Sequence, residues 1–148
     1  MNKQISIVLL SFVFMMGCTA TLPKLGVISD QLTPCPSKPN CVSSQATDKE
    51  HYIQPIDFTG TPQDAQVRLL KILNALERTN IIVVQENYIR VAFRSKLFQF
   101  IDDVEFYFPA TNTEHIIINF RSASRIGYSD LGANQKRMEQ IRDIFNEY

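Results

Sequence analysis

The spacing of apolar residues changes along the chain, and these changes predict its secondary structure. Between residues 61 and 80, apolar side chains recur every three or four positions, which is the period of an amphipathic helix. Thr61 and Pro62 are typical of a helix start, and Asn80 is the expected C-cap. The expected buried stripe of this helix contains Ala65, Leu69, Ile72, Leu73 and Leu76.

Beyond residue 80 the period becomes two, the alternation of half-buried strands. Strands are expected at residues 81–85, 88–95, 98–108 and 115–122. Glu86-Asn87 is the hairpin turn between the first two. A second helix follows, capped by Ser129 or Asp130, with an expected stripe of Leu131, Met138, Ile141 and Phe145. This order predicts an α+β fold: a four-stranded antiparallel meander with both helices packed on one face.

The N-terminus has the pattern of an export signal. Lys3 precedes an apolar run over residues 5–16, which is too short to span a bilayer but typical of a secretory leader. The run ends in Gly17-Cys18 and resembles a bacterial lipobox. We therefore expect a signal peptide at residues 1–17 and lipidation of Cys18, and the alternative is a plain signal peptide with a chance cysteine.

Lipidation of Cys18 would place the protein in the cell envelope, with the lipid bilayer as its partner. Thr19, rather than Asp, follows the anchor, and under the usual sorting of such lipoproteins this implies the periplasmic face of the outer membrane. Residues 18–32 lack periodicity and are expected to form a tether. Residues 33–148 are then a single periplasmic domain.

The other two cysteines, Cys35 and Cys41, form an even pair in an oxidising compartment, which favours a disulfide over two free thiols. The chain-entropy model gives about 2 kcal/mol of stabilisation for so small a ring. No metal site is expected, since His51 and His115 lack zinc-ligand spacing relative to the cysteines.

Charge and composition exclude some functions. The formal net charge is zero, which argues against a general nucleic-acid binder. Five scattered glycines offer no phosphate-binding loop, and we expect no cofactor.

The predicted sheet carries one polar face. The alternation directs an apolar set toward the helices: Val91, Phe93, Val104, Phe106, Phe108, Ile116, Ile118 and Phe120. The opposite face is rich in arginine and contains Arg90, Arg94, Asp103, Glu105, Tyr107, Asn119 and Arg121. It is either a solvated face with cross-strand ion pairs or a site for an anionic or carbohydrate ligand. Asp102 falls on the core side, where its expected partner is Arg121 or Arg125.

Residues 121–130 are the most polar segment and lie between a strand and the start of a helix. They either hold an anion or form a structural loop in which Arg125 pairs with Asp102 or Asp130. The candidate binding residues of the chain are Arg94, Asp103, Glu105, Arg121, Arg125, Tyr128 and Asp130.

Known catalytic patterns do not emerge. Asp103 and Glu105 share a face, but neighbouring arginines are expected to keep both ionised rather than raise one pKa. No residue is therefore assigned a catalytic role. An unrecognised hydrolase or transferase acting on an envelope lipid or glycan, through Asp103, Glu105 and Tyr128, remains the alternative.

Several motifs together resemble the domain-of-unknown-function family numbered 1499. They are Leu32-x-Pro34-Cys35-Pro36-x-x-Pro39-Asn40-Cys41-Val42-Ser43-Ser44, Phe93-Arg94-Ser95, Asp102-Asp103-Val104-Glu105-Phe106 and Arg121-Ser122-x-Ser124-Arg125-x-Gly127-x-Ser129-Asp130-Leu131-Gly132-x-Asn134. Gln135 departs from the pattern, where a basic residue is common. Members occur in bacterial envelopes, often as lipoproteins, and in plant plastids.

The resemblance implies that Cys35, Cys41, Asp103 and residues 121–134 form a shared surface, and it carries no reaction or cofactor. Together with the export signal, it leads us to expect a non-enzymatic envelope lipoprotein. Its domain would bind an anionic small molecule or another envelope component through the arginine-rich face.

Overall fold

The computed structural model describes residues 22–148 of the chain. The signal peptide and Cys18 therefore lie outside the described residues. The elements, in chain order, are β1 (Val27–Ile28), β2 (Gln31–Leu32), β3 (Cys41–Ser43), β4 (Ile56–Thr59), α1 (Pro62–Ala75), β5 (Thr79–Gln85), β6 (Tyr88–Arg94), β7 (Ile101–Tyr107), β8 (His115–Ser124) and α2 (Ala133–Glu147).

The predicted meander is present, but it is only part of a larger sheet. Strands β5 to β8 pair in sequence, and both β3 and β4 add to the free edge of β8, giving six strands rather than four. Strand β8 is ten residues long. Strand β4 covers its residues 115–118 and β3 covers its residues 121–123. The expectation of four strands was wrong because β3 and β4 are too short to alternate recognisably.

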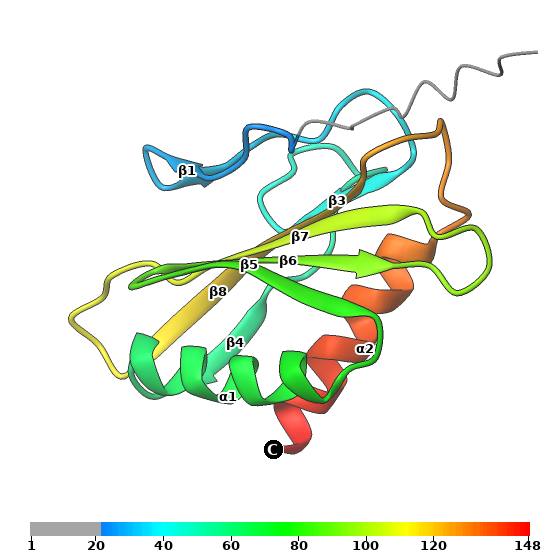
Figure 1. Cartoon of the computed structure of the whole chain (residues 1–148). Helices are drawn as coiled ribbons and strands as arrows, with labels where there is room; N and C mark the ends of the chain where they lie inside the picture. The colour runs from blue at the N-terminus through cyan, green and yellow to red at the C-terminus, as the bar shows by residue number, and fades with distance from the viewer. Residues whose placement is uncertain (1–21) are drawn as a thin grey trace, which may run out of the picture.

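Both helices cover one face of the sheet, as Figure 1 shows. The apolar positions assigned to that face by alternation all belong to the main core, packed with the buried residues of α1 and α2. The register runs unbroken through Asp102 and Asp103, so the parity used to assign the faces is confirmed.

Helix α1 begins as the sequence indicates, with Thr61 and Asp64 in a reciprocal capping box. It ends earlier than expected, at Ala75 with Leu76 as C-cap. The hydroxyl of Thr79 donates to the carbonyls of Leu73 and Leu76 and satisfies groups left free at the helix end. Asn80 therefore belongs to strand β5 and not to a cap.

Helix α2 begins at Ala133, after Gly132 in a left-handed conformation. The Asp130 carboxylate accepts the backbone N–H groups of Gly132 and Asn134 at 3.0 and 2.7 Å. Because the helix starts beyond Leu131, that residue is 97% exposed rather than part of the buried stripe. Asn134 takes the first buried position instead.

The other face of the sheet is covered by the N-terminal strap, which we define as residues 22–32. The small hairpin of β1 and β2 lies over this face in Figure 1. Leu32 packs with Tyr88 and Tyr107 in a second small apolar cluster, with Val27 and Val83 at its margin. The segment expected to be a tether is therefore, from residue 22 onward, part of the folded domain. None of the helices within residues 22–148 is long and apolar enough to cross a membrane.

Candidate anion-binding site

The charged side chains of the outer sheet face form two rows across the strands. Antiparallel pairing sets Arg90 opposite Glu105, and Glu105 opposite Arg121. In the next row, Asp103 lies between Ala92 and Ala123. Because the two alanines are small, space remains around Asp103 for long side chains to fold over it. We call Arg90, Asp103, Glu105, Arg121 and Arg125 the arginine cluster.

Asp103 is held by two arginines. Its Oδ1 accepts Nε and Nη2 of Arg90 at 3.1 and 2.9 Å and Nη2 of Arg125 at 2.9 Å, and its Oδ2 accepts Nε of Arg125 at 2.7 Å. Burial by itself would raise the pKa of Asp103, but the hydrogen bonds from Arg125 and Arg90 outweigh it and hold that pKa below the ordinary value. Both carboxylate oxygens thus accept hydrogen bonds from arginine, and their charge is compensated.

Glu105 is fully buried and differs from Asp103. Its Oε1 accepts the Tyr88 hydroxyl at 2.8 Å, and its Oε2 lies 3.3 Å from Nη1 of Arg121. Burial raises the pKa of Glu105 above its ordinary value, against the opposing effects of Tyr88 and Arg121. The expectation was that neighbouring arginines keep both groups ionised rather than raise one pKa; the lowered pKa of Asp103 agrees with it, whereas the pKa of Glu105 is raised by burial.

The N-terminal strap covers this cluster. The Pro23 carbonyl accepts Nη1 of Arg90 at 3.1 Å, and the backbone at Gly26 acts to lower the pKa of Glu105. The Tyr107 hydroxyl donates to Asp30 at 2.6 Å, and burial together with Asp30 raises the pKa of Tyr107 to about 12. The outer face is therefore a buried ionic layer between sheet and strap, not the solvated face that was one of the two expectations.

Arg121 is the member with the fewest partners. It is 6% exposed, and its one hydrogen bond, to Glu105, is long at 3.3 Å. Its Nε is one of two buried side-chain polar atoms without a partner within residues 22–148, and the other is Oδ1 of Asn40. An unpaired buried donor is costly, so this Nε is a place where a bound group would be stabilised.

Arg121 and Arg125 line a cleft of about 200 Å³, together with Pro23, Leu25, Asp103, Ala123, Ser124 and Ile126. We call it the anion cleft. Ser124 pairs with Asp102, so its hydroxyl lies on the core side of the sheet, where it accepts a hydrogen bond from Asn134 of α2 at 3.1 Å. The other walls of the cleft are Asp103 and the apolar residues Pro23, Leu25, Ala123 and Ile126. The volume is that of roughly six water molecules, enough for a small anionic group.

A larger groove of about 530 Å³ lies between the strap, Cys35 and residues 43–48. Neither of the two unpartnered polar atoms lines it. Within residues 22–148, no group of three or more His, Cys, Asp or Glu side chains could hold a metal ion.

The core side of the sheet carries a separate polar network. Asp102 accepts from Nη2 of Arg137 at 2.6 Å, so the expected partners Arg121 and Arg125 were both wrong. Arg137 lies on α2, whose position relative to Asp102 depends on helix packing. Asn134 accepts from Arg137 and Ser122 and donates to the Asn40 carbonyl, which joins α2, β8 and the disulfide loop.

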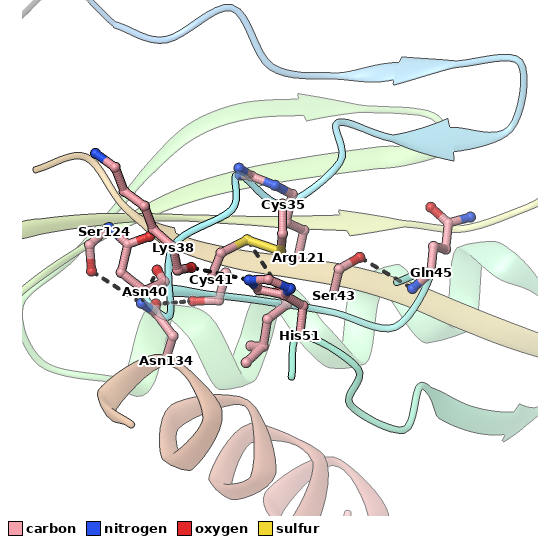
Figure 2. Close-up of a disulfide and its surroundings, with 12 residues drawn as sticks. Cys35, Lys38, Asn40, Cys41, Ser43, Gln45, His51, Arg121, Ser124 and Asn134 are labelled. Atoms are coloured by element: carbon pink, nitrogen blue, oxygen red, sulfur yellow. Dashed lines mark hydrogen bonds between the residues drawn. A yellow bond between two sulfur atoms is a disulfide. The ribbon is translucent and has the colours of Figure 1, made fainter. Parts of the chain in front are cut away.

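Cys35 and Cys41 form a disulfide. Figure 2 shows Arg121 beside it and His51 below, with a ring nitrogen of His51 directed at Lys38. His51 Nδ1 lies 2.7 Å from Asp48 Oδ1, and Nε2 lies 3.1 Å from the Lys38 carbonyl. Since both partners are acceptors, they favour the imidazolium form, in which both ring nitrogens can donate. These bonds outweigh burial and raise the pKa of His51.

The structure separates the candidate residues into groups. Asp103, Glu105, Arg121 and Arg125 meet in the arginine cluster. Arg94 and Tyr128 are exposed and do not line the anion cleft, and Asp130 serves the start of α2. Arg125 pairs with Asp103, not with Asp102 or Asp130.

The contributions of Pro23 and Leu25 to the cleft were missed. The strap residues carry only a faint signal, the apolar positions Leu25, Val27 and Leu32 in an otherwise irregular segment.

The shared surface implied by the motifs divides between the two faces of the sheet. Asn40 donates to the Gly127 carbonyl, and Asn134 donates to the Asn40 carbonyl, so the disulfide loop and the segment after β8 do lie together. These contacts explain several motif residues by folding alone. They do not explain the unpartnered Nε of Arg121.

Among curated proteins, no sequence matches this chain. Residues 31–145 match the family described as "Protein of unknown function (DUF1499)". This match spans β2 through most of α2 and includes the arginine cluster, the disulfide and the Asn134 network. The chain therefore belongs to the DUF1499 family.

Proposed function

We propose that this protein is a lipid-anchored lipoprotein of the bacterial envelope whose domain binds a small anionic group, a carboxylate or phosphate ester, in the anion cleft. The observation that carries the binding proposal is the unpartnered Nε of the buried Arg121 at this cleft. The expected signal peptide and Cys18 support the proposed location in the envelope.

The charge balance favours an anion. The arginine cluster contains three guanidinium groups and two carboxylates, an excess of one positive charge when all are ionised. Burial raises the pKa of Glu105. Asp103 also lines the cleft, but its charge is compensated by the ion pairs with Arg90 and Arg125. A planar guanidinium edge matches the geometry of carboxylate and phosphate oxygens.

The alternative of hydrolysis or group transfer has less support. Glu105 is fully buried beneath the strap, Asp103 is neutralised, and Tyr128 is exposed in the loop before α2. A general acid or base must come within hydrogen-bond distance of the substrate atom that gains or loses a proton. Glu105 is buried, and both oxygens of Asp103 already accept from arginine.

Titration of the acylated full-length protein with inorganic phosphate, butyl phosphate and butyrate tests the proposal. Ionic strength is held constant with chloride, and binding is followed by NMR shifts of the Ser124 and Arg125 amides. We expect saturable shifts, and a loss of affinity of about tenfold or more in Arg125→Gln, because a charge-assisted hydrogen bond is lost.

Arg94→Gln is the matched control, since it removes the same charge from an exposed side chain outside the cleft. It should change affinity by less than about twofold, because exposed charges are screened. If Arg125→Gln fails to fold, Arg121→Lys replaces it, which keeps the charge but removes the Nε donor. Equal affinities in all variants, or shifts that never saturate, would contradict the proposal.

A further inference from the structure

The exposed apolar side chains of the described residues gather at one end of the sheet. Seven of the thirteen large exposed hydrophobic residues belong to the start of the strap, the β6–β7 loop and the β8–α2 loop. They are Leu22, Leu97, Phe98, Phe100, Ile126, Tyr128 and Leu131. Scattered single apolar residues are ordinary on a protein surface, whereas a concentration of this kind marks an interaction surface.

The two loops are neighbours. The Arg125 N–H donates to the Ile101 carbonyl at 3.0 Å, and Asp102 pairs with Ser124. Figure 1 shows the β6–β7 and β8–α2 connections at the same end of the sheet. Pro23 and Leu25 line the anion cleft with Arg125 and Ile126, which brings the start of the strap to the same region.

The tip of the β6–β7 loop is the most exposed part of this end. Leu97 is 83% exposed and Phe98 is 72% exposed. The Phe98 ring stacks on Phe100 with centroids 5.5 Å apart, so the two rings project as a unit. Arg94 and Lys96 are exposed beside them, and the loop contains no acidic residue. Aromatic and aliphatic side chains flanked by cations fit the interfacial region of a bilayer.

The position of the proposed anchor indicates that the lipid bilayer is the partner of this surface. Cys18 precedes Leu22 by four residues, and a fully extended residue spans at most about 3.6 Å, so the acylated residue lies within about 14 Å of Leu22. Whatever path those residues take, the beginning of the strap is held close to the membrane. The sheet end beside it is then the nearest part of the domain to the lipid.

We propose that this end of the domain, which we call the docking end, rests on the bilayer, with Leu97, Phe98 and Phe100 inserted among the acyl chains. The inference rests on the proposed lipid anchor. It goes beyond the anchor, since a lipidated Cys18 alone would hold the domain near the membrane without fixing its orientation. Insertion of the β6–β7 loop would fix the orientation of the domain, with the opposite end of the sheet turned away from the lipid.

The chain has no tryptophan, so a single tryptophan can report on this contact. Phe98→Trp places it at the loop tip. Val84→Trp is the matched control, because Val84 is 50% exposed but lies beside the β5–β6 turn, at the opposite end of the sheet. Both variants are prepared as the acylated full-length protein. They are bound to vesicles of phosphatidylethanolamine and phosphatidylglycerol, with or without a fraction of phosphatidylcholine brominated in its acyl chains.

We expect the Phe98→Trp emission to shift to shorter wavelength on vesicles and to lose most of its intensity to the brominated chains, while Val84→Trp emission stays unchanged. Far-UV circular dichroism checks that both variants fold, and Leu97→Trp substitutes if Phe98→Trp does not. Equal, weak quenching of the two variants on protein that carries the acyl mass and sediments with vesicles would overturn docking and leave the anchor intact.

Two further outcomes also decide the matter. A blue shift of Phe98→Trp that depends on protein concentration and not on vesicles would assign the surface to a second copy of the chain and overturn docking. A protein that carries no acyl mass and does not sediment with vesicles would remove the anchor itself, and docking with it.

Discussion

At the scale of single residues, the role of His51 becomes clear only from its contacts in the folded structure. In the sequence, His51 stands out only as a residue type that can bind a metal. In the structure it joins the Asp48 carboxylate to the Lys38 carbonyl and so holds the disulfide loop. Its raised pKa is consistent with two acceptors and one imidazolium ring.

The stability of the protein should therefore fall in alkaline solution. A raised folded-state pKa contributes stability that is complete below the ordinary histidine pKa of 6.5 and is lost as the pH rises through the folded value. Thermal unfolding at pH 6 and pH 9 should show a midpoint lower by a few degrees at the higher pH, and His51→Gln should abolish most of that difference. His115→Gln, at an exposed position, should retain it. Identical profiles for the wild type and His51→Gln would refute this role.

At the scale of elements, sequence periodicity accounts for what lies on each side of the sheet but not for what covers it. The alternation placed Asp103, Glu105 and Arg121 together because parity is a local property of an unbroken strand. Arg137 as the partner of Asp102, and Pro23 as the partner of Arg90, come from segments 35 and 67 residues away along the chain. No local pattern encodes such pairings.

The strap should open as a unit when its hydrogen bond to the sheet is removed. Tyr107→Phe deletes the bond to Asp30, and we expect strap opening to become easier by about 1–2 kcal/mol. Amides of residues 26–32 should then exchange hydrogen roughly five- to thirtyfold faster, while those of β7 and β8 remain protected. Tyr52→Phe removes a hydroxyl from an exposed side chain and is the control. Unchanged exchange in the strap would mean that its other contacts, which include the Pro23–Arg90 hydrogen bond and the apolar cluster around Leu32, hold it without the bond to Asp30.

At the scale of the whole molecule, the anchor, the strap and the docking end form one continuous arrangement. The strap begins within four residues of Cys18 and runs across the arginine cluster, so the segment nearest the proposed anchor is also part of the anion cleft. A pull or displacement at the N-terminus would act directly on Pro23 and Leu25.

The proposed anchor predicts the form of the mature protein. Intact mass measurement of material extracted from membranes should give a chain that begins at Cys18 and carries diacylglyceryl and acyl groups, because several chains are needed for stable attachment. Labelling the unreduced protein with a thiol reagent should leave Cys35 and Cys41 unmodified. A mature chain that begins elsewhere without added lipid would exclude the anchor, and reaction at both cysteines would exclude an oxidising location.

The sequence by itself determined the two helices, the β5–β8 meander, the face of each strand residue and the cysteine pair, because periodicity, capping and short loops are properties of neighbouring residues. Only the tertiary structure decided that the polar face is buried, which arginine serves which carboxylate, and that Arg121 keeps an unpartnered donor beside a cleft. Those outcomes depend on the strap, the β3 and β4 additions and α2 meeting the sheet. Such long-range packing is decided by the sum of many contacts and leaves little trace in any one segment.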